Sequence, residues 1–105
     1  MILAVTEPTV SGVNDLERVL RLTNHFKVKS VIIINKADLN PDMSIKIHKL
    51  AESVNSKVIA EIPFDRNVHD ALMAGKTIIE HGKGEAYEII KNLWKKIRDC
   101  VLVSC

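Results

Sequence analysis

The feature that most constrains the fold is a run of four β-branched residues, Val31-Ile32-Ile33-Ile34, with no polar residue among them. A strand with one solvent-exposed face alternates apolar and polar residues, whereas this run places apolar side chains on both faces of the strand. Such a strand needs cover on both sides, as a central strand of a parallel sheet has. The run therefore predicts a buried strand over residues 30–35, between layers of helices.

The rest of the chain alternates between strand-like and helix-like patterns. Apolar runs at 2–6 and 57–62 end at Glu7-Pro8 and at Pro63, and they predict two more strands. Elsewhere, apolar residues recur with the spacing of one helix face, which predicts amphipathic helices. These stripes contain Leu16, Val19, Leu20, Thr23 and Phe26; Ile47, Leu50, Ala51 and Val54; Val68, Ala71 and Leu72; and Ala86, Ile89, Ile90, Leu93 and Ile97.

Residues with strong capping preferences mark where the helices are expected to begin. Ser11 is expected to cap the first helix and Asn40 the second, where a proline follows in the first turn. Asn67 or Asp65 is expected to cap a short third helix. Residues 77–79, Thr-Ile-Ile, are expected to form a short extended piece before the last helix.

This order of elements predicts an α/β fold, with three layers, α/β/α, around a mainly parallel sheet. Residues 1–105 contain no repeat, low-complexity tract or linker, so we expect a single domain or a part of one. The composition agrees, because 47% hydrophobic residues with only 4% aromatics indicate an aliphatic core.

Charge, cysteine placement and the N-terminal run argue against several other classes of protein. The formal net charge of +2 is too small for an obvious nucleic-acid footprint. Cys100 and Cys105 can cross-link only a short tail, so they do not indicate a disulfide scaffold. The apolar run at 1–5 has no basic lead-in and is too short for a signal peptide or a membrane span. We therefore expect a cytoplasmic chain.

Polar residues follow all three predicted strands at the point where each strand ends. In doubly wound sheets, ligands bind beyond the carboxyl ends of the strands. Because parallel strands end at the same edge of a sheet, the three loops are expected to lie along one rim. They are Thr6-Glu7-Pro8-Thr9, Asn35-Lys36-Ala37-Asp38 and Pro63-Phe64-Asp65-Arg66.

Asn35-Lys36-Ala37-Asp38 matches the Asn-Lys-x-Asp pattern of loops that recognise purine bases. The Asn35 amide offers a donor and an acceptor to the edge of a base. The aliphatic stem of Lys36 can lie over the ring or the ribose while its ammonium stays in water. The Asp38 carboxylate can accept hydrogen bonds from ring N–H and exocyclic amine donors, which guanine has. The alternative is an ordinary polar turn that caps the next helix.

Five segments follow one another at spacings that are typical of one protein superfamily. They are Leu3-Ala4-Val5-Thr6-Glu7-Pro8-Thr9, Ser11-Gly12, Asp15-Leu16-Glu17-Arg18, Ile34-Asn35-Lys36-Ala37-Asp38-Leu39-Asn40 and Ile62-Pro63-Phe64-Asp65. Together they resemble the C-terminal portion of the MinD/ParA/Mrp superfamily of P-loop ATPases, in the branch that carries an inserted ferredoxin-like iron–sulfur segment. The resemblance covers the chain up to about Lys96.

The resemblance implies a nucleotide-binding function, since members of the superfamily hydrolyse ATP with Mg²⁺ and usually work as nucleotide-dependent dimers. It implies that Asn35 contacts the adenine edge and that the loop Pro63–Asp65, with Phe64 at its centre, closes over the base. Thr6, Glu7 and Pro8 are implied to lie near the nucleotide rim and the dimer face. The superfamily typically has Arg or Lys after the asparagine, as here.

The sequence also departs from the superfamily. It has no Gly-x-x-x-x-Gly-Lys-Ser/Thr stretch to hold phosphates, no upstream strand-end Asp to organise Mg²⁺, and no cysteine-rich insert. In the superfamily these lie N-terminal to the equivalent of Leu3, so Met1 is interpreted as an artificial, alternative or split-gene start. We assign no catalytic residue and expect no ATP hydrolysis by this chain alone. The expected partners are a second copy or the missing N-terminal part.

Two other functions stay open. One is a non-enzymatic oligomerising or partner-binding module that kept the fold. The other is a fragment of a GTP-binding protein, which Asp38 favours, although Ala60-Glu61-Ile62-Pro63 lacks the Ser-Ala loop that completes a guanine pocket. The four histidines lack metal-ligand spacing, so no metal site is expected. The basic, amphipathic last helix is interpreted as packing on the sheet rather than as a membrane anchor.

Overall fold

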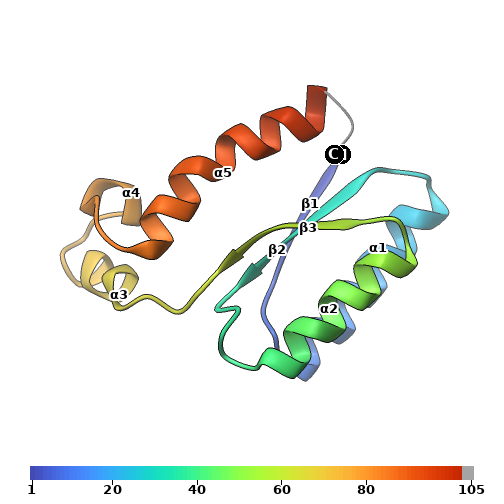
Figure 1. Cartoon of the computed structure of the whole chain (residues 1–105), viewed down its shortest axis with the longest axis horizontal. Coiled ribbons are helices and arrows are strands. Elements are labelled where there is room, and N and C mark those ends of the chain that lie inside the picture. Colours follow the sequence, from blue (N-terminus) through green and yellow to red (C-terminus); the bar gives the residue numbers. More distant parts are fainter. Residues whose placement is uncertain (103–105) are drawn as a thin grey trace.

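A computed structural model of the chain describes residues 1–102 and has an α/β fold. Its three strands are parallel and lie in the order β1-β2-β3, so the parallel sheet predicted from the sequence is confirmed (Figure 1). The described elements are β1 (Ile2–Thr6), α1 (Val10–His25), β2 (Ser30–Asn35), α2 (Pro41–Ser53), β3 (Lys57–Ile62), α3 (Arg66–Met73), α4 (Ile78–His81) and α5 (Glu85–Leu102).

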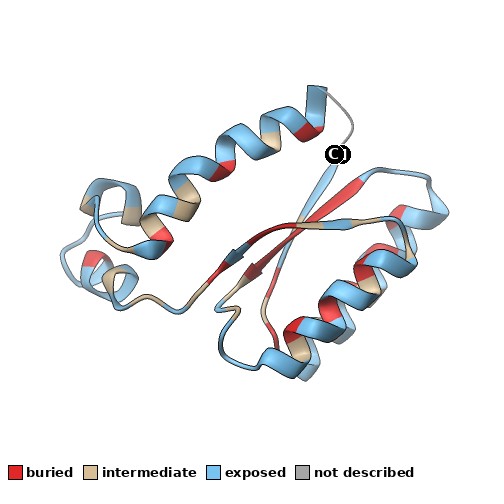
Figure 2. Cartoon of the chain, in the orientation of Figure 1, coloured by how far each residue is buried: buried red, intermediate tan, exposed pale blue. Residues whose placement is uncertain are grey.

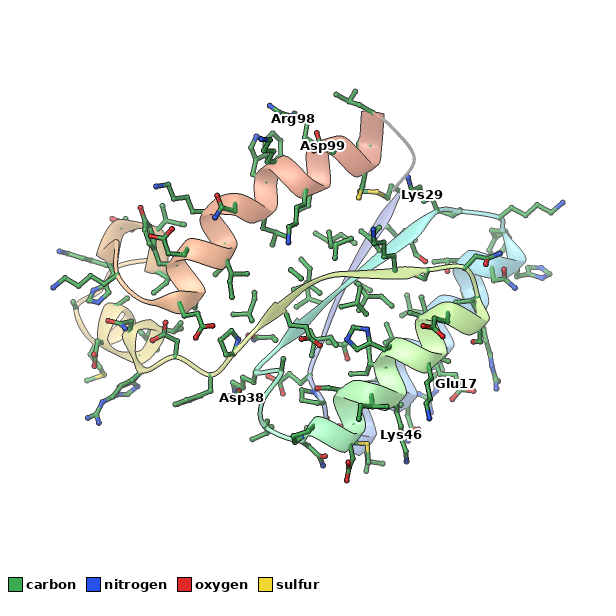
Figure 3. The ribbon with its side chains drawn as sticks, viewed as in Figure 1. Glu17, Lys29, Asp38, Lys46, Arg98 and Asp99 are labelled. Carbon is green, nitrogen blue, oxygen red and sulfur yellow. The ribbon has the colours of Figure 1, made fainter. Side chains whose placement is uncertain are left out.

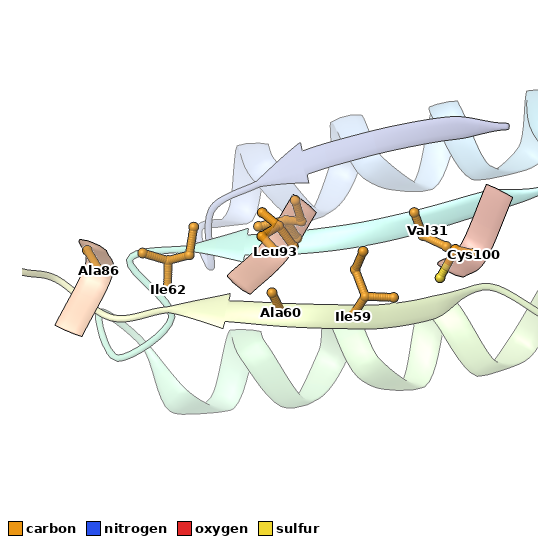
Figure 4. Packing of buried hydrophobic residues seen from close by; sticks show 8 residues of the cluster. Val31, Ile59, Ala60, Ile62, Ala86, Leu93 and Cys100 are labelled. Atoms are coloured by element: carbon orange, nitrogen blue, oxygen red, sulfur yellow. The ribbon is translucent and has the colours of Figure 1, made fainter. Parts of the chain in front are cut away.

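The central strand, β2, is buried on both faces, as its four β-branched residues predict (Figure 2). Ile32 and Ile34 belong to a core cluster shared with α1 and α2. Val31 and Ile33 belong to a second cluster, which α5 covers (Figure 4). Alternate side chains of a strand point to opposite faces, so one strand supplies the centre of both cores.

A β-bulge in β3 adapts the sheet to α5. The β2–β3 register shifts at Ile59, and both Ile59 and Ala60 then face the cluster under α5, whereas Val58 packs on the opposite side. Lys96 Nζ donates a hydrogen bond of 3.3 Å to the carbonyl oxygen of Ile59. The helix therefore satisfies a backbone acceptor at the irregular point of the strand, where ladder pairing is disturbed.

The helices pack mostly through the stripes expected from the sequence, although Val19 of the first stripe is exposed and two larger departures occur. Phe26 is 68% exposed, because α1 ends at His25 and Phe26 is already its C-cap, so extending that stripe to Phe26 was wrong. In α3 only Ala71 is buried, whereas Val68 and Leu72 are exposed. Helical spacing identifies one face of a helix, but it does not say whether anything covers that face.

The prediction that Ser11 caps the first helix was wrong by two residues. Thr9 is the N-cap, and its Oγ1 accepts a hydrogen bond of 3.0 Å from the N–H of Gly12. Ser11 lies inside the first turn. The expected caps at Asn40 and Asp65 are confirmed, with each side chain accepting from a backbone N–H of the following turn.

The extended piece expected over residues 77–79 was also wrong. Thr77 caps the short helix α4 and forms a capping box with Glu80, since Thr77 Oγ1 accepts from the Glu80 N–H at 3.1 Å and Glu80 Oε1 accepts from the Thr77 N–H at 3.1 Å. These two local hydrogen bonds outweigh the strand preference of the two isoleucines between them.

The last helix, α5, packs on β3 as expected, with Ala86 and Leu93 buried. Lys29 Nζ donates to the carbonyl oxygen of Cys100 at 2.7 Å and ties the end of the helix to the start of β2. Among residues 1–102, no helix has both the length and the apolar character that a membrane span needs. Cys105, which was considered together with Cys100 as a possible cross-link, lies outside the described residues.

The outer edge of β1 has no neighbouring strand within residues 1–102, and apolar side chains surround it. Val5 is 63% exposed, and the strand carries no charge or proline of the kind that protects edges. We therefore expect the isolated chain to self-associate through β1, which sedimentation velocity would show as a sedimentation coefficient that rises with protein concentration.

Val5→Lys is expected to reduce the association, because a lysine on an edge strand disfavours strand pairing. The control introduces the same charge at a site away from the β1 edge. Ile45→Lys, on the exposed face of α2, should leave the association as it is in the wild type. A single species over the whole concentration range would contradict the prediction.

Candidate functional site

The three loops that follow β1, β2 and β3 lie along one rim, as expected for parallel strands. Lys36 Nζ and Glu7 Oε1 are 3.5 Å apart, which joins the first loop to the second. The N–H of Phe64 donates to Asp38 Oδ1 at 2.8 Å, which joins the second loop to the third. The Glu7–Lys36 pair is half-exposed and contributes little to stability, but it fixes where both side chains lie.

The β1–α1 loop presents Glu7 to the rim and keeps its neighbours inside. Thr6 is buried, and its Oγ1 donates to the carbonyl oxygen of Gly12 at 3.1 Å. Pro8 is fully buried. A Cβ atom at Gly12 would overlap the carbonyl oxygen of Glu7, so only glycine permits this close turn. Of the three residues expected near the rim, Thr6 and Pro8 support the loop and Glu7 is accessible.

The β2–α2 loop makes a sharp turn at Lys36, whose φ of 52° lies in the left-handed region. The N–H of Lys36 donates to Asn35 Oδ1 at 3.1 Å, and the N–H of Ala37 donates to the carbonyl oxygen of Ile62 at 3.0 Å. Ser44 Oγ of α2 holds the Ala37 carbonyl at 2.7 Å. Within residues 1–102, Asn35 Nδ2 has no hydrogen-bond partner, so it remains a donor for a ligand.

A shallow slot of about 220 Å³ opens beside Asn35. This volume is below the roughly 300–1,000 Å³ of pockets that hold drug-sized ligands, so the slot suits a flat fragment such as a base. Its walls are mostly apolar, and Asn35 is one of its polar lining residues. The slot is lined by Asn35, Lys36, Ile62, Pro63, Phe64, Asp65, Val68, His69 and Leu72.

Helix α3 supplies two slot residues, Val68 and Leu72, that were predicted only as part of the apolar stripe of an amphipathic helix. Phe64, Val68 and Leu72 are four residues apart and exposed, and all three line the slot. The spacing was visible in the sequence, but the same pattern describes a helix face that packs on a sheet. No local signal separates the two cases, because Thr9 caps α1 three residues beyond β1, just as Asp65 caps α3 three residues beyond β3, and α1 packs on the sheet.

Asp65, expected both in the loop over the base and as a cap of α3, lines the slot, and its carboxylate caps two helices. Asp65 Oδ1 accepts from the N–H and the Nδ2 of Asn67 at 2.9 Å each, and Oδ2 accepts from the N–H of Ala86 at 3.0 Å. Gly84 is required beside it, because a Cβ atom there would overlap Asp65 Oδ2. Asp65 therefore fixes the start of α3 against the start of α5.

These hydrogen bonds lower the pKa of Asp65 below its ordinary value; the bond from the Ala86 N–H contributes most, followed by the bonds from Asn67. Stability from the ionised carboxylate is therefore fully present above the unfolded pKa of about 3.9, and it is lost as the pH falls through the lower folded pKa. Urea denaturation of the wild type and Asp65→Asn should show a gap in midpoint at pH 7 that shrinks below about pH 4.

The matched control is Asp70→Asn, since Asp70 is an exposed residue of α3 whose side chain makes no hydrogen bond within residues 1–102. This variant should follow the wild type at both pH values. If the gap between the wild type and Asp65→Asn stayed constant from pH 7 to pH 3, the ionised carboxylate would not be the source of the stability.

A larger open groove of about 600 Å³ runs along β1 and the first turns of α1 and reaches Asn35 at the rim. Its polar lining includes Glu7, Ser11 and Asp15, and Leu3 and Val5 are among its apolar lining residues. No three His, Cys, Asp or Glu side chains of the described chain converge on a point that a metal ion could occupy. The groove and the slot meet at Asn35, which lines both.

Comparison with known proteins identifies one similar protein, whose name gives no activity. The sequence matches no family model. It is 31% identical over 101 residues to an uncharacterized protein of Methanocaldococcus jannaschii, and the aligned part covers 94% of this chain and 32% of that protein. The chain thus spans about a third of the length of the relative. Because the relative is itself uncharacterized, what the chain does must be inferred from the rim.

Proposed function

We propose that this chain binds a nucleotide, ATP, through its base, and that it is the base-recognition portion of a MinD/Mrp-like P-loop ATPase. The observation that carries the proposal is the mostly apolar, base-sized slot that Asn35 lines, since the Asn35 amide has a donor unused within residues 1–102. A purine ring offers two apolar faces and a polar edge. The slot offers apolar walls to the faces and one amide to the edge.

Two features favour adenine over guanine. Asparagine pairs well with adenine, because its amide accepts from the exocyclic amine and donates to a ring nitrogen. Guanine recognition needs an acceptor for the ring N–H and the exocyclic amine, and Asp38 was the candidate. One oxygen of Asp38 is already bonded to the N–H of Phe64, and the residue does not line the slot.

The proposal for this chain is base recognition rather than hydrolysis. Phosphoryl transfer depends on cations and backbone donors placed around the phosphates, and the 105 residues contain no glycine-rich phosphate-binding loop. In the ATPases that the sequence resembles, Mg²⁺ neutralises the phosphates when bound. Glu7 lines the groove, Lys36 lines the slot, and their charged ends are 3.5 Å apart, which supports a position for both beside the sugar and phosphates of a nucleotide whose base fills the slot.

The test is a titration of the ¹⁵N-labelled chain with ATP and, separately, with GTP, followed by chemical-shift changes. We expect ATP to shift the side-chain amide of Asn35 and the backbone signals of Phe64 and Leu72, with tighter binding than GTP. Preference for GTP would overturn the adenine assignment. Shifts confined to other parts of the chain would overturn the slot as the binding site.

The open edge of β1 supports a second candidate, a non-enzymatic oligomerising module. In that case the exposed apolar residues of β1 pack against a second copy, and the rim loops only cap helices. The same titration separates the two functions. An oligomer that forms through β1 and shows no nucleotide-induced shift at Asn35 would favour the module.

A further inference from the structure

We propose that Asp38 is a positioning residue that holds Phe64 over the slot, rather than a residue that reads the base. This inference rests on the proposed function and assigns the two polar ends of the Asn-Lys-x-Asp loop to different tasks. Asn35 faces the ligand, and Asp38 fastens one wall of the site. The starting observation is the hydrogen bond of 2.8 Å from the N–H of Phe64 to Asp38 Oδ1, which joins residues 26 positions apart. Figure 3 labels Asp38 in the loop that follows β2.

The contact continues the pairing of β2 and β3 beyond the ends of both strands. Asn35 pairs with Ile62 at the end of the ladder, and the N–H of Ala37 then donates to the carbonyl oxygen of Ile62 at 3.0 Å. The bond between Phe64 and Asp38 is the next rung, made by a side chain because the backbone of residue 38 has already turned toward α2. Three consecutive rungs therefore hold the third loop against the second.

Asp38 and Asn35 lie on opposite sides of this ladder. Asn35 lines the slot together with Phe64 and Leu72, and Asp38 does not. Asp38 instead lines a separate recess with His48 and Glu61. A base in the slot beside Asn35 is thus separated from the Asp38 carboxylate by the hydrogen-bonded backbone of the two loops.

Phe64 has few other restraints, which is why one hydrogen bond matters. Its side chain is 65% exposed, and the residue lies between the end of β3 and the cap of α3. Asp65 fixes the backbone on the far side of Phe64 through its bonds to Asn67 and Ala86. With Asp38 on one side and Asp65 on the other, the backbone that carries the aromatic ring is held beside the slot that Phe64 lines, which is a form of preorganisation.

The first measurement tests the hydrogen bond between Phe64 and Asp38 in the absence of nucleotide. In Asp38→Ala, hydrogen exchange at the Phe64 amide should accelerate by about tenfold or more, because a hydrogen bond to a charged acceptor is lost. Asp38→Asn should largely restore the protection, since its amide oxygen can still accept. Asp42→Ala, an exposed carboxylate in the first turn of α2, is the control and should leave Phe64 exchange at the wild-type rate. Equal exchange in the wild type and Asp38→Ala would overturn the proposal.

The second measurement compares ATP, GTP and xanthosine triphosphate as probes. Xanthine has a carbonyl where guanine has its exocyclic amine, so a carboxylate that reads the base favours guanine and an amide in its place favours xanthine. We expect Asp38→Asn to leave the ratio of GTP to xanthosine triphosphate affinity unchanged, and Asp38→Ala to weaken all three ligands by a similar factor. A tenfold or larger shift of the ratio toward the xanthine nucleotide in Asp38→Asn would show that Asp38 reads the base.

The two measurements keep this inference separate from the proposed function. If the wild-type chain bound none of the three nucleotides, the proposed function would fail, and Phe64 exchange would still decide whether Asp38 positions the loop. If ATP bound at the slot and Asp38→Ala changed neither exchange nor affinity, the proposed function would stand and the role given to Asp38 would fall.

Discussion

Asn35→Ala is expected to lower the affinity of the chain for ATP by about 10- to 100-fold, the range that corresponds to losing one well-placed pair of base hydrogen bonds. The physical reason is that the Asn35 amide lines the slot with Nδ2 unused within residues 1–102. The apolar lining residues contribute stacking that does not distinguish one base from another. The variant should therefore also lose most of its preference for ATP over GTP.

The measurement is the dissociation constant from the chemical-shift titration, with Asn14→Ala as the matched control. Asn14 is an exposed asparagine of α1, far along the chain from the slot, and its replacement should leave the affinity for ATP at the wild-type value. Because Asn35 Oδ1 also accepts from the N–H of Lys36, the variant needs a check that the loop is intact. Unchanged Phe64 amide exchange provides that check. An affinity within twofold of the wild type would remove Asn35 from the site.

The fold was readable from the sequence because its strongest signals are local. The Val31–Ile34 run can be buried on both faces only at the centre of a sheet, and the structure places β2 there. Asn40 before a proline marks the start of α2 for reasons contained in a few residues. The prediction of an extended segment at Thr77 was wrong because its capping box with Glu80 is a local signal for a helix, and it outweighs the strand preference of β-branched residues.

The candidate site was readable only in part, because the role of a polar residue depends on its partner in space. The sequence places Asn35, Asp38 and Asp65 at strand ends, and all three are at the rim. Nothing in the sequence says that Asp38 bonds to Phe64, 26 residues away, or that Asp65 caps α5 as well as α3. The resemblances implied base-side roles for all three, whereas in the structure Asp38 and Asp65 each accept hydrogen bonds from backbone N–H groups of neighbouring segments.

The second large effect concerns the core on which the rim is built, and the variant is Ile34→Ala. Ile34 of β2 is fully buried under the helices α1 and α2, where it packs in one cluster with Leu20 and Ile47. Removing its side chain leaves a cavity, and substitutions of this kind cost about 2–5 kcal/mol. Domains of this size are stable by only about 5–15 kcal/mol, so the variant should lose a large share of its stability.

Urea denaturation followed by circular dichroism measures this loss, and it is preferable to tryptophan fluorescence because Trp94 is exposed in the folded chain. The midpoint should fall while the slope stays the same, which would show that the native state, and not the compactness of the unfolded chain, has changed. Ile45→Ala, on the exposed face of α2, removes the same atoms outside the core and should change the free energy of unfolding by no more than about 0.5 kcal/mol. Both variants are compared at protein concentrations below the onset of self-association, because association stabilises the folded state by mass action. If the two alanine variants unfolded at the same midpoint, the cluster around Ile34 could not be the core that holds Asn35 and its loop at the rim.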